Sequence, residues 1–428
     1  MVSAQPARIL AAVMAKREFA AELFDQLRSD GLDEPGVTRD PYGEGEQRGH
    51  ATVRSAGKQL GLAIDQDDAA NLYMTWRGQN RSAPRVMIGS HIDSVPHGGN
   101  FDGAAGVVAG LVAISALQAL GQTPRPPVTV MGIRAEESIW FEVSYIGSRG
   151  ALGALPDGAM QASRRDTGRS LAEHIDACGG RSSALSSGRG YLNPKEIAAF
   201  LELHIEQAPS LVAAGLPVGI CTGIPGNFRY PNAVIYGQHD HVGLPRRFRR
   251  DAAVAAAELA MRLDAIWEDY ESRGIPMAFT LGRFHTDPAL HGMTIVPGAF
   301  HFSLDVRAYD PRVLESLEQE FSTLVTGIEQ RRGVRFELGA KAQAAVGRMS
   351  PGIKAGLERS ATELGMRWME LGSPASHDAA AFAAAGVPTG MVFIRNENGS
   401  HNPHEAMEID DFLAGTAVLA NWLASSVA

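Results

Sequence analysis

Strand-length apolar segments alternate with helix-like segments along most of this chain, and several of the strands end at histidine or acidic residues. Three such strands, with the groups at their ends, are 85–88 with His91 and Asp93, 127–133 with Glu136 and Glu137, and 200–205 with His204. Strands that alternate with helices predict an α/β fold whose sheet carries helices on both faces. Polar groups at the carboxyl ends of such strands gather at one edge of the sheet, where ligands bind.

The middle of the chain follows a different order. Its expected elements are a strand at 233–236, a helix at 251–267, strands at 277–282 and 300–307, and a helix at 311–330. This order suits a small α+β layer inserted into a larger domain. We therefore predict a larger domain from residues 1–214 and 336–428, interrupted by a smaller α+β domain over 215–335. The periodicity of the larger domain predicts further helices at 7–27, 49–60, 103–120, 352–364 and 409–423, and strands at 70–76 and 389–394.

Charge and composition exclude several classes of partner. The formal net charge is -9 and no segment concentrates Lys and Arg enough to offset it, which argues against a nucleic-acid partner. No apolar run approaches the ~18 residues needed to span a bilayer, and the alanine-rich N-terminus reads as an amphipathic helix, not a signal peptide. The two cysteines, Cys178 and Cys221, suit a reducing cytoplasm and support neither a disulfide framework nor a thiolate metal site.

Histidine and aspartate at the end of an apolar strand are costly to bury unless something pairs with them, and a divalent metal ion can do so. The candidate ligands are His91, Asp102, Glu137, His204 and His401. Any single histidine or aspartate is more often a hydrogen-bonded structural residue than a ligand, and a Glu-Glu pair is usually part of a solvated face. The recurrence of such clusters after separate apolar strands favours a hydrolytic metal site, although the residues alone leave both interpretations open.

Two acidic residues beside these ligands have predicted roles of their own. His91 and Asp93 lie two apart on a strand and point to the same face, so Asp93 can accept the second imidazole N–H and fix the tautomer of His91. Glu136 and Glu137 are adjacent and point in different directions, so that one can bind metal while the other reaches a metal-bound water. A carboxylate base beside a polarised water is suited to amide hydrolysis.

Four segments carry a resemblance to a known family. Residues 89–96 (GSHIDSVP) with 98–103 (GGNFDG), 202–207 (ELHIEQ) and 399–403 (GSHNP) resemble, in the same order, the motifs of the M20-type metallo-amidases. The hydantoinase/carbamoylase branch is the closer match; it contains N-carbamoyl-L-amino-acid hydrolases, β-ureidopropionases and allantoate amidohydrolases. The resemblance runs from about residue 35 to the C-terminus.

The resemblance implies a dinuclear-metal hydrolase domain with a mixed sheet, interrupted by a lid domain that also forms a homodimer contact. Asp102 would bridge two metals, His91 and His204 would complete one ion, and Glu137 and His401 would complete the other. Glu136 would be the general base that activates the bridging water, so that the nucleophile is a metal-bridging hydroxide. The ligand set has no thiolate and suits Zn²⁺, but also Mn²⁺, Co²⁺ or Ni²⁺.

Further residues match the substrate-binding positions of this family. His241 matches a lid histidine that stabilises the tetrahedral oxyanion in the neighbouring subunit; His239 is an alternative, and the loop at 244–247 (LPRR) departs from the family pattern. Arg307 matches the arginine that grips the substrate carboxylate, although a surface ion pair would also explain it. Gln207 and His377 match residues that line the pocket.

Several departures from the family pattern concern the substrate. Thr294 stands where a pocket asparagine is usual, and 138–140 (SIW) stands where Gly-Ser-Arg usually follows the glutamate pair. Ser376 and Ala208 each replace a glycine. The metal set is complete and the substrate set is altered, which indicates a substrate different from the common ones.

The first hypothesis for function is a metal-dependent amidohydrolase that cleaves the C–N bond of an N-carbamoyl or related N-acyl amino acid. A dipeptidase or N-acyl amino acid deacylase on the same scaffold is the second. A catalytically inactive metal-binding dimer is the third, and the retention of Glu136 with all five ligand types argues against it. The expected partners are a small substrate that bears a carboxylate and a second copy of the chain.

Overall fold

The computed structural model describes residues 4–426, which divide into two compact units. The first contains the described residues up to Ile224 and from Arg348 onward, and the second is Pro225–Gly347. The expected boundaries lay about ten residues earlier at each crossing, at 214/215 and 335/336. The difference arises because β8 (Val218–Cys221) pairs within the sheet of the first unit, whereas β17 (Ala342–Ala344) pairs within that of the second.

The first unit is built on an eight-stranded mixed sheet with the order β19-β8-β20-β7-β5-β6-β4-β3. Besides β8, its strands are β3 (Ala63–Gln66), β4 (Leu72–Trp76), β5 (Arg85–His91), β6 (Val128–Ile133), β7 (Ile197–Ile205), β19 (Trp368–Leu371) and β20 (Thr389–Ile394). The four central strands β6, β5, β7 and β20 are parallel to one another. The pairs β3–β4, β4–β6 and β8–β20 are antiparallel, which makes the sheet mixed, and β19 pairs in parallel with β8.

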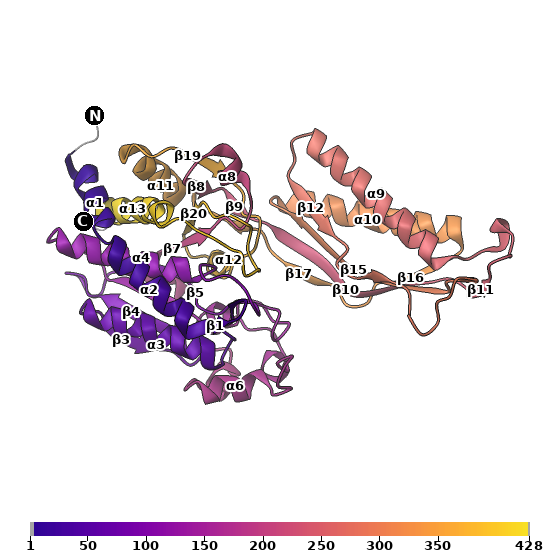
Figure 1. Cartoon of the computed structure of the whole chain (residues 1–428), viewed down its shortest axis with the longest axis horizontal. Coiled ribbons are helices and arrows are strands. Elements are labelled where there is room, and N and C mark those ends of the chain that lie inside the picture. The colour runs from indigo at the N-terminus through magenta and orange to yellow at the C-terminus, as the bar shows by residue number, and fades with distance from the viewer. Residues whose placement is uncertain (1–3, 427–428) are drawn as a thin grey trace. The chain divides into compact units, whose positions relative to one another are not determined.

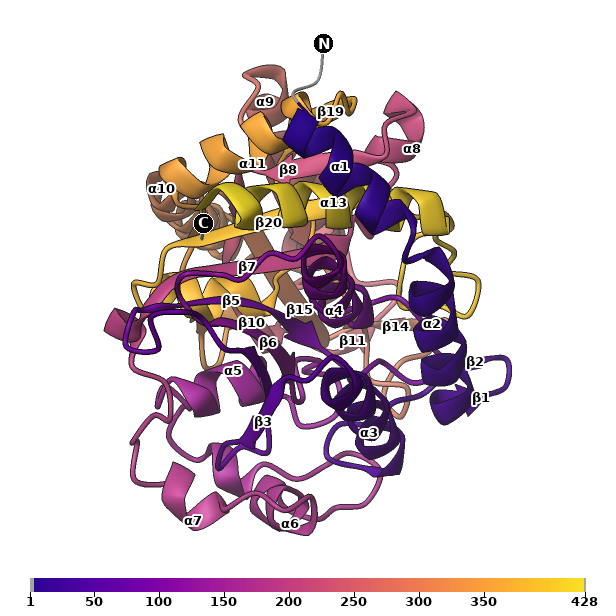
Figure 2. The ribbon, with the colours of Figure 1, turned by 90° about the vertical axis from the view of Figure 1, so that its left-hand side faces the viewer.

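Helices cover both faces of this sheet, as the alternation predicted. One face packs on α1 (Ala4–Met14), α2 (Arg17–Gly31), α3 (Glu44–Gln59), α4 (Ala104–Ala119), α11 (Pro351–Glu363) and α13 (Ile409–Ser426). The other face packs on α5 (Ile146–Ala151) and α12 (Asp378–Ala384). Successive residues of β5 alternate between these cores, with Ile88 in the first and Met87 in the second. Figure 2 shows α4 and α13 in front of the central strands.

The connections of the first unit hold the remaining short elements. These are β1 (Leu32–Asp33), β2 (Gly36–Val37), η1 (Ala159–Gln161), α6 (Leu171–Ala177), α7 (Ser182–Leu185), η2 (Pro194–Glu196), α8 (Ser210–Ala214) and β9 (Gly223–Ile224). β9 pairs with β18 (Gly347–Arg348), whose first residue is the last one of the second unit. The single helix expected over 7–27 is two helices, because the helical conformation is interrupted between Met14 and Arg17. No helix among residues 4–426 is both long and apolar enough to cross a bilayer.

The second unit is a sheet with two long helices on one side (Figure 1). The strands in the order β12-β15-β10-β16 are Met277–Thr280, Ala299–Ala308, Gly226–Tyr236 and Arg335–Glu337. In addition, β13 (Phe284–His285) pairs with β15, and β17 pairs with β10. The helices are α9 (Ala252–Ser272) and α10 (Pro311–Arg332). Every second residue of β15 is buried, as expected for a sheet with one covered face. A separate pair, β11 (Asp240–His241) and β14 (Ile295–Val296), lies outside this sheet.

Candidate metal centre

The carboxyl ends of β5, β6 and β7 bring distant parts of the chain together in the first unit. β5 pairs in parallel with β6, with His91 opposite Ile133, so the segment with Glu136 and Glu137 leaves the sheet beside His91. β7 pairs with β20, with His204 opposite Phe393, and the chain after β20 leads to His401. The parallel register therefore explains why ligands so far apart in sequence share one edge.

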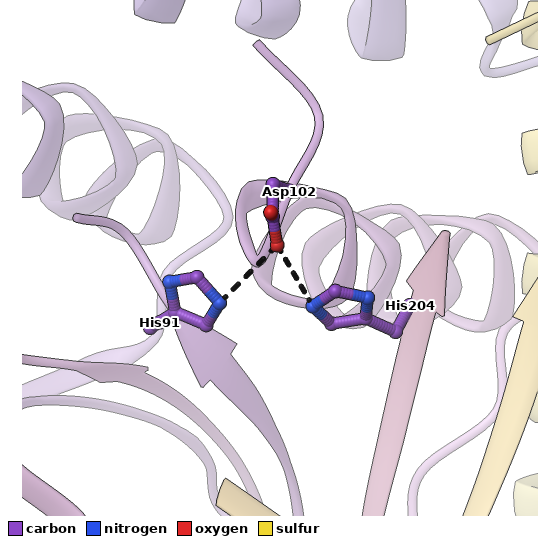
Figure 3. A group of neighbouring side chains, drawn as sticks. All are labelled: His91, Asp102 and His204. Atoms are coloured by element: carbon purple, nitrogen blue, oxygen red, sulfur yellow. Dashed lines mark ion pairs between the residues drawn. The ribbon is translucent and has the colours of Figure 1, made fainter. Parts of the chain in front are cut away.

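Two imidazoles and one oxygen of Asp102 form the inner cluster. His204 Nε2 lies 3.2 Å from Asp102 Oδ1, and His91 Nε2 lies 3.5 Å from the same oxygen (Figure 3). All three side chains are buried. In Figure 3, His91 lies at the end of its strand, His204 lies on β7, and Asp102 lies between the two rings.

The outer cluster uses the second oxygen of the same aspartate. His401 Nε2 lies 3.3 Å from Asp102 Oδ2 and 3.2 Å from Glu137 Oε1. The side chain of His401 is 52% exposed, whereas that of His91 is 3% exposed. His401 has a φ of 59°, a left-handed conformation that non-glycine residues rarely adopt and that is common at functional sites. Asp102 thus faces two clusters, one through each oxygen.

A glycine makes the close approach of His91 to Asp102 possible. Gly103 has a φ of 65°, and a Cβ placed there would lie 2.5 Å from the ring of His91. Any side chain would push the imidazole away from Asp102. The space that the ring of His91 occupies therefore explains why a glycine follows Asp102 in segment 98–103.

Backbone carbonyls orient both inner imidazoles. His91 Nδ1 lies 3.0 Å from the carbonyl oxygen of Asp93 and 3.5 Å from its carboxylate Oδ1, and His204 Nδ1 lies 2.9 Å from the carbonyl of Ile205. With Nδ1 facing a carbonyl, Nε2 faces Asp102, where it can donate to the carboxylate when it is protonated and can bind a metal ion when it is not. Asp93 was expected to hold His91 through its carboxylate, but the shorter contact is made by its backbone, and its carboxylate accepts N–H groups from Glu136 and Glu137.

Sequence reasoning missed two residues that hold Asp102 in place. Glu405 Oε1 accepts the backbone N–H groups of Phe101 (2.8 Å) and Asp102 (3.3 Å). Ser400 Oγ lies 2.8 Å from Asp102 Oδ2 and 2.6 Å from Glu405 Oε2. Glu405 follows the segment 399–403 by two positions, so its place beside that motif was the available signal.

Arg39 is a third residue that sequence reasoning missed. It is fully buried and donates to the carbonyl of Ile92 (2.6 Å) and to the side-chain and backbone oxygens of Asn100 (both 3.1 Å). It thereby ties together the two ends of the segment that carries His91 and Asp102. Nothing in its local sequence distinguishes it from a surface arginine.

The carboxylates of the cluster favour the protonated, positively charged form of the neighbouring histidines. Burial alone would lower the pKa of His91, but hydrogen bonds to Asp102 and Asp93 raise it well above its ordinary value. Hydrogen bonds to Asp102 and Glu137 raise the pKa of His401 to about 11. Burial, followed by the nearby Glu137 carboxylate, raises the pKa of Glu136 well above its usual range. Protons on the imidazoles balance the carboxylates here, and divalent cations bound by the same atoms would replace those protons.

Among residues 4–426, three groups of side chains have donor atoms close enough to hold an ion. The inner group is His91, Asp102 and His204, and the outer group is Asp102, Glu137 and His401. The third group contains Glu202, His204 and His377. The carboxylate of Glu202 already accepts from Ser90 Oγ (2.6 Å) and the N–H of Ala379 (2.8 Å), so its oxygens are satisfied without a metal. The inner and outer groups are therefore the ones whose donor chemistry fits a pair of ions, with carboxylate and imidazole ligands and no thiolate.

Of the residues expected to line the substrate pocket, two lie at this cluster. Gln207 Nε2 donates to Asp102 Oδ2 (2.9 Å), and its Oε1 is buried and has no hydrogen-bond partner among residues 4–426. The buried ring of His377 lies with its centroid 4.2 Å from that of His204, and its Nε2 contacts Ser373 Oγ at 2.9 Å. Gln207 therefore presents an unused acceptor beside the bridging position.

The other expected substrate residues belong to the second unit. His241 and Thr294 lie on and beside the β11–β14 pair, where the N–H of Val242 donates to the carbonyl of Thr294 at 2.9 Å. Both side chains are exposed. Arg307 lies on β15 and donates to both carboxylate oxygens of Asp305, from Nε (3.1 Å) and Nη2 (3.2 Å).

Trp140, in the segment that departs from the family pattern, contacts the segment that follows His91. Its Nε1 donates to the carbonyl of Ser94 at 3.0 Å, and the guanidinium of Arg164 lies 4.9 Å from its ring centroid. The tryptophan thereby joins the chain after Glu137 to the segment that follows His91.

The mixed α/β sheet, with imidazoles and one shared carboxylate at its strand ends, indicates that the protein is a candidate metal-dependent hydrolase. The chain belongs to peptidase family M20/M25/M40, whose family model matches residues 87–425. It is 34% identical to an N-carbamoyl-L-amino acid amidohydrolase of Geobacillus stearothermophilus over 90% of this chain and 92% of that protein. It is 30% identical to an allantoate amidohydrolase of Escherichia coli (strain K12), over 94% of this chain and 96% of that protein.

A solved structure gives the same relationship. An amidase of the hydantoinase/carbamoylase family from Burkholderia multivorans superimposes with a TM-score of 0.84 at 26% identity, covering 96% of this chain and 98% of that one. The family, the mixed α/β fold and the resemblance to the hydantoinase/carbamoylase branch expected from the four motifs are confirmed.

Proposed function

We propose that this protein is a metal-dependent amidohydrolase that cleaves the C–N bond of an N-carbamoyl or related N-acyl amino acid. The observation that carries the proposal is the pair of clusters that share Asp102, with Glu136 next in sequence to the outer ligand Glu137. Relatives that act on carbamoyl amino acids and on allantoate support the substrate class, since both names denote small linear amides or ureides.

Two divalent ions are the proposed cofactor. His91, Asp102 and His204 would hold one ion, and Asp102, Glu137 and His401 the other. Imidazole and carboxylate ligands without a thiolate suit Zn²⁺, with Mn²⁺, Co²⁺ or Ni²⁺ as alternatives. A bound pair of ions supplies Lewis-acid polarisation of the scissile carbonyl and lowers the pKa of water.

Glu136 is the proposed general base. Its carboxylate would take a proton from the attacking water and return it to the leaving nitrogen, so that the same Oε atom serves both proton transfers. Burial beside other carboxylates raises the pKa of Glu136 well above its ordinary value, so its carboxylate is a stronger base than that of an exposed glutamate. The carboxylate of Asp93 accepts the N–H of Glu136 at 3.0 Å and so fixes the backbone that carries the base.

The proposed substrate contacts come from residues in each of the two units. Gln207 and His377 lie at the cluster, and we propose that Arg307 binds the substrate carboxylate while His241 and Thr294 contact the reacting group. Asp305 accepts from Arg229 (2.7 Å) as well as from Arg307, so two guanidinium groups face a single carboxylate and leave a net positive charge for an anionic substrate. A homodimer, in which His241 completes the site of the partner subunit, is part of the same proposal.

The test is ammonia release from a panel of N-carbamoyl amino acids and allantoate by protein loaded with Zn²⁺, Mn²⁺ or Co²⁺. We expect turnover of at least one member, and a loss of about 10²–10⁴-fold in Glu136→Gln with both metal ions retained. Release of a free acid and an amine without ammonia, from dipeptides or N-acyl amino acids, would instead identify a dipeptidase or deacylase. Full activity of Glu136→Gln would contradict the assigned base.

A further inference from the structure

Three consecutive backbone N–H groups beside the metal cluster donate to buried carboxylate oxygens. The N–H of Ala135 donates to Glu46 Oε1 at 2.9 Å, and those of Glu136 and Glu137 donate to Asp93 Oδ1 and Oδ2, both at 3.0 Å. Ala135 has a φ of 52°, so the chain turns sharply here in a conformation that alanine adopts only when its surroundings impose it. Asp93 lies within the first metal motif. Glu46 lies outside all four motifs, on α3.

Glu46 is itself fixed by the residue that precedes this turn. Glu46 Oε2 accepts from Arg134 Nη1 and from the backbone N–H of Tyr42, both at 2.7 Å. Arg134 also donates from Nε to the carbonyl of Ala70 at 3.1 Å, and it contacts Gln47 Oε1. Glu46 and Arg134 are both buried, so the ion pair is shielded from water and removal of one partner leaves the other uncompensated.

The position of Glu46 on its helix supports this arrangement. α3 begins at Glu44, so Glu46 lies in the first turn, where the helix dipole favours a carboxylate. From there one carboxylate holds both the N–H of Ala135 and the side chain of Arg134. The backbone of the turn is thereby fixed on one side by Glu46 and on the other by Asp93.

A rigid turn matters because two neighbouring side chains must serve different purposes. Glu137 is directed to His401, with Oε1 and Nε2 3.2 Å apart, while the carboxylate of Glu136 must remain free to act as the base. The two carboxylates repel each other, so a looser backbone would let them move apart. Hydrogen bonds from N–H groups to charged carboxylates are about twice as strong as neutral ones and can resist that movement.

We propose that Glu46 is a positioning residue that holds Glu136 as the base and Glu137 as a metal ligand, acting through the backbone of the turn at Ala135. This inference rests on the proposed function. It assigns to α3 a part in catalysis that none of the metal or substrate motifs contains.

The principal variant is Glu46→Gln, which keeps the shape but removes the charge. We expect kcat to fall about 10–100-fold with KM changed less than twofold, since residues that orient ligands have effects of this size. In calorimetric titration of the metal-free protein with Zn²⁺, we expect the outer site to weaken by a similar factor and the inner site to remain unchanged. Glu46→Asp keeps the charge near Arg134 but withdraws it from Ala135. It should lower kcat with a smaller loss of melting temperature than Glu46→Gln causes. This second variant replaces Glu46→Gln if that one does not fold.

The matched control is Asp411→Asn. Asp411 is a buried carboxylate of the same unit that accepts from Arg395 Nε at 2.7 Å, and it touches none of the proposed site residues. Its substitution should lower the melting temperature but leave kcat and both Zn²⁺ sites as they are. The double variant Glu46→Gln with Arg134→Met removes the unpaired cation, and we expect it to recover stability without recovering kcat.

The inference would be overturned if Glu46→Gln and Glu46→Asp both kept kcat and outer-site Zn²⁺ affinity within twofold of the unmodified protein. Recovery of kcat together with stability in the double variant would overturn it equally, because Glu46 would then act only through the fold. Glu136→Gln, measured alongside, separates this failure from that of the proposed function. If Glu136→Gln remains fully active the assigned base is wrong, and if it is inactive while the Glu46 variants are normal only the inference about Glu46 fails.

Discussion

The two halves of the candidate metal centre share one aspartate but are built differently. The inner half takes its imidazoles from His91 and His204, which lie on strands of the parallel core and are 3% and 0% exposed. The outer half takes Glu137 from a turn and His401 from a loop, and His401 is 52% exposed. The donor types are nearly the same, so the difference lies in how firmly the backbone behind each ligand is held.

This difference shows which interactions hold the backbone of each candidate ligand in place. The backbones of His91 and His204 are held by the hydrogen bonds that pair β5 with its neighbours and β7 with its neighbours. Local unfolding of either strand would disrupt the sheet. Glu137 and His401 depend on separate side chains instead. Asp93 holds the backbone of Glu137, and Ser400, next to His401, is held by Glu405. We therefore expect the inner half to determine whether metal binds and the outer half to determine how easily an ion exchanges.

Removal of one imidazole from each half should give the largest contrast. His204→Ala should lower the metal content below one ion per chain and reduce activity by about 10³-fold or more, because several kcal/mol of Lewis-acid stabilisation are lost. His401→Ala should keep the inner ion and lose only the outer one. Metal content by atomic emission, together with ammonia release, measures both effects. Equal metal loss in the two variants would remove the distinction between the halves.

Metal exchange should separate the halves without any substitution. When a chelator is added to the fully loaded protein, we expect one ion to leave at least about 10-fold faster than the other, the ratio that a 1.4 kcal/mol difference in barrier produces. Ser400→Ala removes a hydrogen bond to Asp102 Oδ2 and should speed only the fast phase. Release of both ions in a single phase would contradict the comparison.

A methyl group beside His91 should damage the inner half alone. Gly103→Ala imposes a left-handed alanine, which costs about 1–2 kcal/mol, and also places a Cβ 2.5 Å from the ring of His91. Gly121→Ala is the matched control, because Gly121 has a φ of 71° and open space around it. The free energy of unfolding should fall in both variants, and inner-site Zn²⁺ affinity only in Gly103→Ala. Equal Zn²⁺ affinity in the two would show that the ring has room to move.

The smallest effect concerns a buried acid near the inner half. Burial, followed by the charge of Glu202, raises the pKa of Asp378 from 3.8 to about 8. The folded protein therefore keeps this proton where the unfolded chain has lost it, so the stabilising contribution is complete below about pH 4 and is lost as the pH rises through about 8. Asp378→Asn should flatten the fall in melting temperature of the metal-free protein over that range, by a few degrees. An unchanged pH profile would show that Asp378 is ionised when buried.

The sequence predicted those features that depend on the local pattern. The alternation of strands and helices identified β5, β6, β7 and β20 and the helices around them, because period and apolar content are properties of short segments. The four motifs and the glutamate pair led to the candidate ligand residues that the structure brings together in two clusters. The break between α1 and α2 was missed because the apolar spacing runs through it.

The residues that support the ligands could not be found in this way. Three buried charged residues contact backbone groups that are far from them in sequence: Glu46, Arg39 and Glu405. In the sequence alone, nothing distinguishes them from exposed charged residues. Glu46 was also hidden because α3 begins at Glu44, five residues before the expected start at 49. β8 was missed because its four residues are too short for a clear period, and this moved the domain boundary.

The position of β20 within the sheet has a consequence for synthesis of the protein. β20 is the last strand in the chain, yet it lies between β8 and β7, and α13 packs against both α1 and α4. The sheet of the first unit therefore cannot close until residue 394 has left the ribosome, and until then β7 and β8 present unpaired edges beside the uncharged α4. We expect nascent chains that stop short of β20 to depend on chaperones and to aggregate when released.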